Sequence, residues 1–223
     1  MASRRDVNLG ILSTAAAAAT ATLAATRSLA QTGQAIALPA PAITGGKPLM
    51  DSLSARQSIR DYADRALSNQ DLSNLLWAAW GVNRPQQDGR TTPRWRHVNL
   101  LDIYAIRADG VWLYEPKPHR LVFHMAGDLR GQTTNSQTFV ATAPLNLAYA
   151  VDTAKITGEP ESYKYATVGA TAGVSAQNVY LYCASAGLAT VFRQTVPASR
   201  AKTLNLPPGQ VIPVAQSVGY PKA

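Results

Sequence analysis

Two arginines and a serine lie within five residues in the run Arg56-Gln57-Ser58-Ile59-Arg60. An Arg side chain offers planar, paired donors to phosphate oxygens, and a Ser hydroxyl adds a short neutral donor. The run is therefore equipped to hold a phosphate monoester. Basic runs of this length also occur by chance on solvated surfaces, so an exposed basic turn is the alternative interpretation.

An amphipathic helix is expected after the basic run. This helix must help to position the basic run. Ser68 can cap its first turn, with Asp71 three residues later as the acidic partner. Between residues 71 and 81, apolar side chains recur at helical spacing, which predicts one buried face. These side chains are Leu72, Leu75, Leu76, Ala79 and Trp80.

The remaining pattern predicts a small sheet and one long helix. In residues 101–106 and 111–114, apolar and polar side chains alternate on either side of the turn Ala108-Asp109-Gly110, which predicts a hairpin. Residues 119–124 suggest a third strand. The apolar run 143–151 is typical of a buried central strand. Residues 165–186 favour a helix ended by Gly187, and strands are expected at 188–192 and 211–220. Residues 50–56 favour a short helix or turn. The predicted fold class is α+β, with helices flanking the sheet.

The small residues of the long helix carry a further expectation. Gly169, Ala172, Gly173 and Ala176 would permit close approach of a second helix or of a partner subunit. The single cysteine, Cys183, lies in the apolar part of this helix, so we expect it to be buried and no intrachain disulfide to exist.

Composition limits the classes of function. The chain has 223 residues, 46% of them hydrophobic, and a formal net charge of +8 with a pI near 9.8. Its basic residues are scattered, without a Lys-rich tract or an aromatic-basic RNA motif, so we expect no nucleic-acid partner. A diffuse positive charge suits an anionic cofactor or substrate. The three histidines are too far apart in sequence to predict a metal site.

The first thirty residues resemble an export signal. Ser3-Arg4-Arg5-Asp6-Val7 is a twin-arginine start, an Ala-rich apolar core follows, and Ser28-Leu29-Ala30 offers a cleavage site. Its Ala and Thr content is too mild for a stable membrane anchor. We therefore expect a signal peptide over 1–30, an extended linker over 31–48, a domain over 49–223, and a periplasmic or otherwise exported protein.

The order of these pieces resembles the FMN-dependent nitroreductase superfamily, and within it the branch of short oxidases that includes peptide-azoline dehydrogenases. The resemblance covers residues 53–222. It rests on the basic run and on the segments 72–83, Arg90-Thr91-Thr92-Pro93, 176–181, 187–190 and 218–222. It implies a three-layer fold with a mainly antiparallel sheet, and an intertwined homodimer with each flavin at the subunit interface.

The resemblance also implies an FMN site. Arg56 and Ser58 match residues that hold the phosphate and ribityl chain, with Gln57 between them. Arg60 matches a basic residue at the pyrimidine edge of the flavin, where a cation stabilises the negative charge of the reduced ring. Gly187 and Leu188 match a turn whose backbone approaches the ring. Lys222 or Arg193 is expected to complete the phosphate site.

One segment departs from the family pattern. The family commonly has Pro-Ser-x-x-Asn after the Arg-Thr-x segment, whereas this chain has Pro93-Arg94-Trp95-Arg96-His97. His97 can still donate a hydrogen bond and is assigned to the cofactor site. Arg94 and Trp95 are assigned to a substrate pocket that would favour anionic or electron-rich aromatic molecules. The alternative is that the loop swings outward and its arginines are solvated.

The resemblance implies an FMN-dependent oxidoreductase that passes hydride or electrons between its flavin and a small molecule in an exported compartment. Reduced nicotinamides are cytoplasmic cofactors, so an exported enzyme is expected to use another electron donor. The sequence does not identify that donor. The rival hypothesis is a non-catalytic flavin- or ligand-binding protein on the same fold, its chemistry lost through the change at residues 94–97.

Overall fold

The computed structural model of this chain describes residues 34–194, residue 196 and residues 199–223. Residues 35–223 form one of two units, and the other ends at Gln34. The predicted signal peptide lies outside the described residues, and so does the start of the predicted linker.

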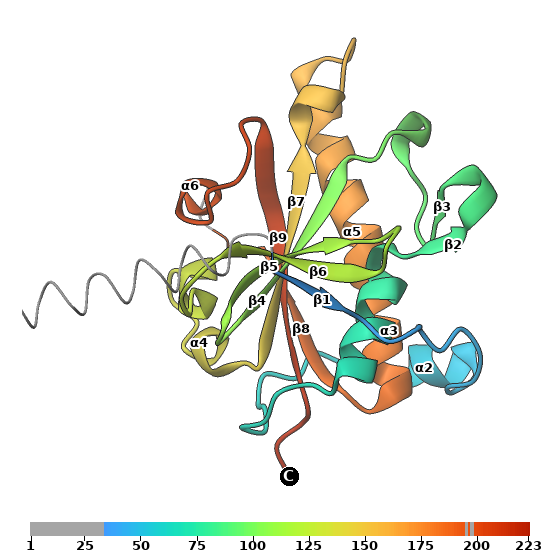
Figure 1. Cartoon of the computed structure of the whole chain (residues 1–223), viewed down its shortest axis with the longest axis vertical. Helices are drawn as coiled ribbons and strands as arrows, with labels where there is room; N and C mark the ends of the chain where they lie inside the picture. The colour runs from blue at the N-terminus through green and yellow to red at the C-terminus, as the bar shows by residue number, and fades with distance from the viewer. Residues whose placement is uncertain (1–33, 195, 197–198) are drawn as a thin grey trace, which may run out of the picture. The chain divides into compact units, whose positions relative to one another are not determined.

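A seven-stranded antiparallel sheet is the centre of the unit, in the order β1-β6-β5-β4-β7-β9-β8 (Figure 1). Its strands are β1 (Ala35–Ala37), β4 (Leu101–Arg107), β5 (Gly110–Glu115), β6 (Arg120–Met125), β7 (Leu145–Asp152), β8 (Ala189–Arg193) and β9 (Gln210–Gly219). A separate hairpin joins β2 (Val82–Arg84) and β3 (Gly89–Arg90). The hairpin predicted around residues 108–110 and the third strand beside it are confirmed.

Helices cover both faces of this sheet. They are α2 (Leu49–Ala55), α3 (Asn69–Trp80), α4 (Phe139–Thr142), α5 (Glu161–Ala186) and α6 (Arg200–Thr203), with short 3-10 turns η1 (Pro85–Gln87), η2 (Trp95–His97), η3 (Arg130–Thr133) and η4 (Thr153–Lys155). The larger core joins α3 and α5 to one face, and the smaller core includes Leu204, just after α6, on the other. The three-layer α+β architecture is therefore confirmed.

The central strand β7 shows why the layers form. Its side chains are almost all buried, and the alternation of a strand sends Leu147 and Tyr149 to the larger core but Ala148 and Ala150 to the smaller one. A continuous apolar run is what a strand covered on both faces requires.

The two principal helices are held by side-chain contacts as well as by apolar packing. The Ser68 hydroxyl accepts a hydrogen bond from the Asp71 backbone N–H at 3.0 Å, which confirms the predicted cap. The Asn178 amide of α5 donates to the Ala78 carbonyl of α3 at 3.0 Å. Gly187 ends α5 with φ +69°, a left-handed conformation that glycine adopts without strain.

Two boundaries differ from the prediction. Helix α5 begins at Glu161, four residues before the expected start, because Pro160 provides an extended residue ahead of its first turn. Part of the predicted linker is strand β1, which pairs with β6 at the edge of the sheet. Among the described residues, no helix is long and apolar enough to span a membrane.

Candidate functional site

The basic run lies against α5 and β8. It is extended, and the Ile59 N–H donates to the Thr190 carbonyl of β8 at 2.9 Å. Ser58 Oγ lies 2.7 Å from the Tyr180 hydroxyl of α5, and the Arg56 guanidinium lies 5.1 Å from the centre of the Tyr180 ring. Arg56 is half-buried, while Gln57, Ser58 and Arg60 are exposed.

Other predicted residues converge on the same place. Gly187 and Leu188 form the turn between α5 and β8, and they directly precede the strand that contacts Ile59. At the end of the chain, the Lys222 backbone N–H donates to the Asp61 carbonyl at 3.3 Å, which puts Lys222 next to the basic run. We call Arg56, Ser58, Arg60 and Lys222 the clamp.

The cations of the clamp have no anionic partner among the described residues. None of the ion pairs found there includes Arg56, Arg60 or Lys222, and their side chains form no hydrogen bond with a described residue. The side-chain donors of these three cations are therefore free to bind an anion.

Arg193 does not belong to the clamp, and this part of the prediction is wrong. It points to the opposite face of the sheet, where its guanidinium donates to the Thr133 carbonyl at 2.9 Å and to Asn146 Oδ1 at 3.1 Å. Burial lowers the pKa of Arg193 to about 10, so it remains protonated at neutral pH. Its role in this protomer is to cross-link η3 and β7.

The segment Pro93–His97 does not swing freely into solvent. Arg94 donates to Asn99 Oδ1 at 3.0 Å and lies 3.7 Å from Asp88, while Arg96 forms a 2.5 Å ion pair with Glu159. Both arginines are therefore paired, although the Arg96 side chain remains 63% exposed. His97 is exposed, with φ +62° and no side-chain partner among the described residues.

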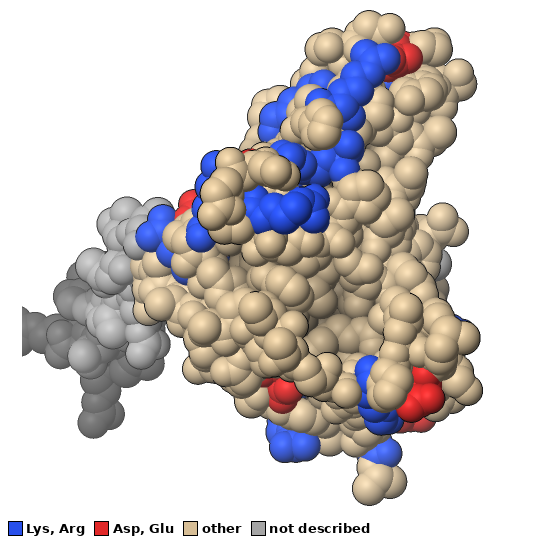
Figure 2. Space-filling view, turned by 90° about the vertical axis from the view of Figure 1, so that its right-hand side faces the viewer, with Lys and Arg blue, Asp and Glu red and all other residues tan. Residues whose placement is uncertain are grey.

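Asp88 organises a group of cations around this segment. Arg90 is hydrogen-bonded to it at 2.7 Å, Lys117 lies 3.5 Å away, and Asn99 donates to its second oxygen. Burial alone would raise the pKa of Asp88, but the Asn99 and Arg90 hydrogen bonds and the nearby cations lower it below its usual range. Figure 2 shows Lys and Arg gathered on the upper part of this face, above a hollow of uncharged residues.

A cavity of about 400 Å³ lies beside α5. Pro93, Arg94 and Trp95 line one side, and the first half of α5 lines the other with Tyr163, Ala166, Thr167, Ala170, Thr171 and Val174. The predicted substrate residues Arg94 and Trp95 therefore line one pocket. Because Arg94 is already paired, the pocket wall is mainly apolar and aromatic.

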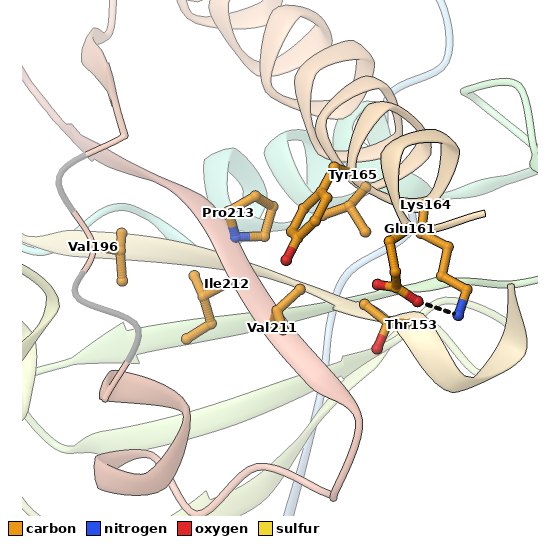
Figure 3. A pocket seen from close by; sticks show the side chains of 9 residues that line it. Thr153, Glu161, Lys164, Tyr165, Val196, Val211, Ile212 and Pro213 are labelled. Carbon is orange, nitrogen blue, oxygen red and sulfur yellow. Dashed lines mark hydrogen bonds and ion pairs between the residues drawn. The ribbon is translucent and has the colours of Figure 1, made fainter.

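A larger cavity of about 460 Å³ lies beside the same half of α5, and it contains none of the predicted site residues. Figure 3 shows the Tyr165 hydroxyl turned toward Val211 and Pro213 of β9, with the Glu161–Lys164 ion pair at the rim. Its charged groups neutralise each other. The clamp is therefore the stronger candidate for binding an anion.

Within one protomer the clamp and the Arg94–Trp95 pocket lie apart. The clamp contacts α5 at Tyr180, whereas the pocket reaches no farther along α5 than Val174. Val174 and Tyr180 are separated by six residues, or about 9 Å along a helix axis. The structure thus does not bring His97, Arg94 and Trp95 beside Arg56 and Ser58 of the same chain.

Tyr180 is the site residue that the sequence did not reveal. It stands in an apolar helical stretch, where a tyrosine is most often part of the core. Nothing in its spacing indicates a contact with Ser58, which is distant in sequence. Among the described residues, no cluster of His, Cys, Asp and Glu is suited to a metal ion. Cys183 is buried, as predicted, and burial raises the pKa of its thiol.

Comparison with known proteins gives one consistent result. A family model described as the nitroreductase family matches residues 53–220. MJ1384 of Methanocaldococcus jannaschii, a candidate nitroreductase, is 33% identical over 155 residues, which cover 64% of this chain and 76% of that protein.

Solved structures agree with the family match. The crystal structure of a candidate nitroreductase from Ralstonia eutropha JMP134 has a TM-score of 0.81 and 36% identity, over 86% of this chain and 91% of that one. The NADPH:FMN oxidoreductase of Vibrio harveyi, solved with NAD+, has a TM-score of 0.58 and 16% identity, over 78% of this chain and 69% of that one. At that identity the likeness shows the fold alone.

Proposed function

The chain belongs to the nitroreductase family, and we propose that it is an FMN-dependent oxidoreductase acting on a small molecule. The observation that carries this proposal is the clamp. It includes Arg56, Arg60 and Lys222, none of which has an anionic partner among the described residues, and both Arg56 and the Ser58 hydroxyl contact Tyr180. A phosphate monoester with a polar chain fits such a group of donors.

The residues of the site fit FMN in the following way. Arg56 and Ser58 would hold the phosphate, with Lys222 close enough in the fold to assist. Arg60 would face the ring edge where negative charge develops on reduction, and a cation there favours the reduced form. Gly187 has no side chain to obstruct a flat ring. The flavin, when bound, supplies reversible two-electron chemistry that no side chain of this protein provides.

We also propose that the protein is a homodimer whose site is completed by its second copy. The exposed side of α5 carries Tyr163, Ala166, Gly169, Gly173 and Val174, and a Cβ added at either glycine would meet nothing within 4 Å. The midpoint of α5 falls between Gly173 and Val174. A two-fold axis there would pair the Tyr180 end of one helix with the Thr167 region of its partner.

This symmetry would unite the two separated halves of the site. The clamp of one protomer would lie beside the Pro93–Trp95 pocket of its partner, because both then occupy the same level of the helix pair. Exposed Leu49, Met50 and Leu53 of α2, which packs near the end of α5, would also be covered. The apolar pocket wall would then exclude water from one side of the ring.

The proposal includes export through the twin-arginine route, which is supported by the sequence at Arg4, Arg5 and Ser28–Ala30 alone. That route carries folded proteins, so the flavin would be loaded before export. The electron donor would then be a molecule present outside the cytoplasm. Detection of the processed protein in a periplasmic fraction, with loss of export in an Arg4→Lys/Arg5→Lys variant, tests this part.

The central experiment is an absorption spectrum of the purified protein before and after dithionite. We expect a yellow protein that releases FMN and not FAD in a stoichiometric amount. Arg56→Ala should weaken flavin retention, whereas Arg107→Ala, which removes an arginine already paired with Asp109, should not. Equal flavin content in the two variants would remove the basis of the assignment.

A non-catalytic flavin-binding protein is the second candidate. The observation that favours it is the departure at Arg94 and His97, where His97 has no side-chain partner among the described residues. Reoxidation by a neutral quinone after dithionite reduction, followed in the absence of oxygen, separates the two. Turnover supports the enzyme, and a stable reduced spectrum supports the binding protein.

A further inference from the structure

Tyr180 connects three parts of the clamp. Its hydroxyl lies 2.7 Å from Ser58 Oγ, and it accepts a hydrogen bond from the Phe192 backbone N–H of β8 at 2.8 Å. Its ring lies 5.1 Å below the Arg56 guanidinium. Only 8% of Tyr180 is exposed, so its orientation is fixed by packing.

The number of hydrogens determines the direction of these bonds. The Phe192 N–H can only donate, so the Tyr180 oxygen is its acceptor. Tyr180 has one hydrogen to give, and Ser58 Oγ is the acceptor within reach among the described residues. When Ser58 accepts that bond, its own hydrogen is free to be donated to another acceptor.

The same side chain restrains Arg56 without using its donors. A guanidinium within about 6 Å of an aromatic ring centre is attracted by the charge distribution of the ring. That attraction leaves the five N–H donors of Arg56 available to an anion. One tyrosine therefore aims a hydroxyl and a guanidinium at the same ligand.

From this arrangement we propose that Tyr180 is a positioning residue for the phosphate of the flavin, acting through Ser58 and Arg56. The proposal rests on the proposed function, because it assumes that the clamp holds FMN. In the bound state the hydrogen bonds run in one direction, from the Phe192 N–H to Tyr180, from Tyr180 to Ser58, and from Ser58 to a phosphate oxygen. Bonds aligned in this way polarise and strengthen one another.

The test compares the affinities of FMN and riboflavin, which differ by the phosphate. Tyr180→Phe removes one oxygen atom and keeps the ring. We expect the dissociation constant for FMN to rise about three- to tenfold, in line with loss of one aligned hydrogen bond, while that for riboflavin stays unchanged. Flavin fluorescence quenching of the apoprotein gives both constants.

Two further variants complete the design. Tyr182→Phe is the matched control, because Tyr182 is also on α5 but its hydroxyl contacts Asp71 at 3.4 Å. It should leave the ratio of FMN to riboflavin affinity unchanged. Ser58→Ala should lower that ratio, and adding Tyr180→Phe to it should lower it little further, because both act on one bond.

The outcomes separate the two proposals. Wild-type protein that binds neither flavin contradicts the proposed function. Wild-type protein that prefers FMN, together with a Tyr180→Phe variant of unchanged preference, overturns the role of Tyr180 alone. A variant weakened equally toward both flavins also overturns it, since a purely structural role predicts that result. If Tyr180→Phe does not fold, 3-fluorotyrosine at position 180, a stronger donor, should raise the preference for FMN, and no change would overturn the role.

Discussion

Single residues decide whether an arginine binds a ligand or holds the fold together. Arg56 and Arg193 both belonged to the predicted cofactor site, but Arg56 has free donors and Arg193 is buried among Thr133 and Asn146. Strand alternation is the reason: Phe192 faces α5, so its neighbour Arg193 must face the other layer. The sequence showed both as basic residues and offered no means of separating them.

This difference predicts opposite effects of two substitutions. Arg193→Ala leaves the buried Thr133 carbonyl without its donor and weakens the contact at Asn146, so we expect a loss of roughly 2–4 kcal/mol in the free energy of unfolding. The folded fraction should still bind flavin with its normal affinity. Arg56→Ala should do the reverse, and chemical denaturation combined with flavin titration measures both. Loss of flavin affinity in folded Arg193→Ala protein would show that Arg193 does contribute to the cofactor site.

A second residue-scale prediction concerns pH. The Ser73 hydroxyl donates to the Pro39 carbonyl at 2.6 Å, so His119 Nε2 must donate to Ser73 at 2.7 Å and His119 Nδ1 must accept from Tyr114 at 2.9 Å. This network requires a neutral imidazole. Burial lowers the pKa of His119 below its usual value, partly offset by a hydrogen bond with Pro39.

The sign of the effect follows from proton binding. Below pH of about 6.5 the unfolded chain takes up a proton at His119 before the folded protein does, so stability falls as pH falls through this range. The slope from this group is at most about 1.4 kcal/mol per pH unit. A His119→Gln variant, whose amide can replace both hydrogen bonds, should show a flatter dependence between pH 7 and pH 5. Equal slopes in the two proteins would mean that His119 does not contribute.

At the scale of elements, local signals that repeat over many residues predicted best. The sequence correctly predicted three such features, which are the Ser68 cap with the periodic face of α3, the turn around Asp109, and the continuous apolar run of β7. Strand β1 was missed because three residues in an Ala- and Pro-rich segment carry little signal of their own. Its pairing is decided by the free edge of β6, which no local pattern displays.

The cap of α3 gives a test at this scale. Ser68→Ala removes the acceptor of the Asp71 N–H, and loss of such a cap costs about 1 kcal/mol. Asp71 also accepts from Tyr220 at 2.7 Å, so the start of the helix should remain anchored and flavin affinity should not change. Ser162→Ala, at an exposed position in α5, is the control and should alter stability by less than about 0.5 kcal/mol. Similar losses in both variants would show that the cap contributes nothing specific.

At the scale of the whole molecule, the sequence indicated most of the candidate site residues but not the distances between them. The clamp and the Arg94–Trp95 pocket are separate within one protomer, because they contact different halves of α5. A family resemblance can supply the residues of an interface site, yet the relation between its halves depends on a symmetry axis that lies outside any one chain. Gly169 and Gly173 of α5, where an added Cβ would meet nothing within 4 Å, are the feature of the protomer that suggests where this axis runs.

Gly173→Leu tests the axis directly. Within the protomer nothing lies within 4 Å of a Cβ at Gly173, and replacing a helix glycine removes about 1 kcal/mol of unfavourable propensity, so the protomer itself should not lose stability. Across a two-fold axis at this point, however, the new side chain would meet its own copy and force the helices apart. We expect light scattering to show a dimer for the wild type and a monomer for Gly173→Leu, with flavin retention falling at the same time because the second half of the site is lost.

Ala108→Leu, an exposed substitution in the β4–β5 turn, should leave both properties unchanged. A Gly173→Leu protein that remains dimeric with full flavin content would show that α5 does not form the contact, and the completed site would have to be sought on another face.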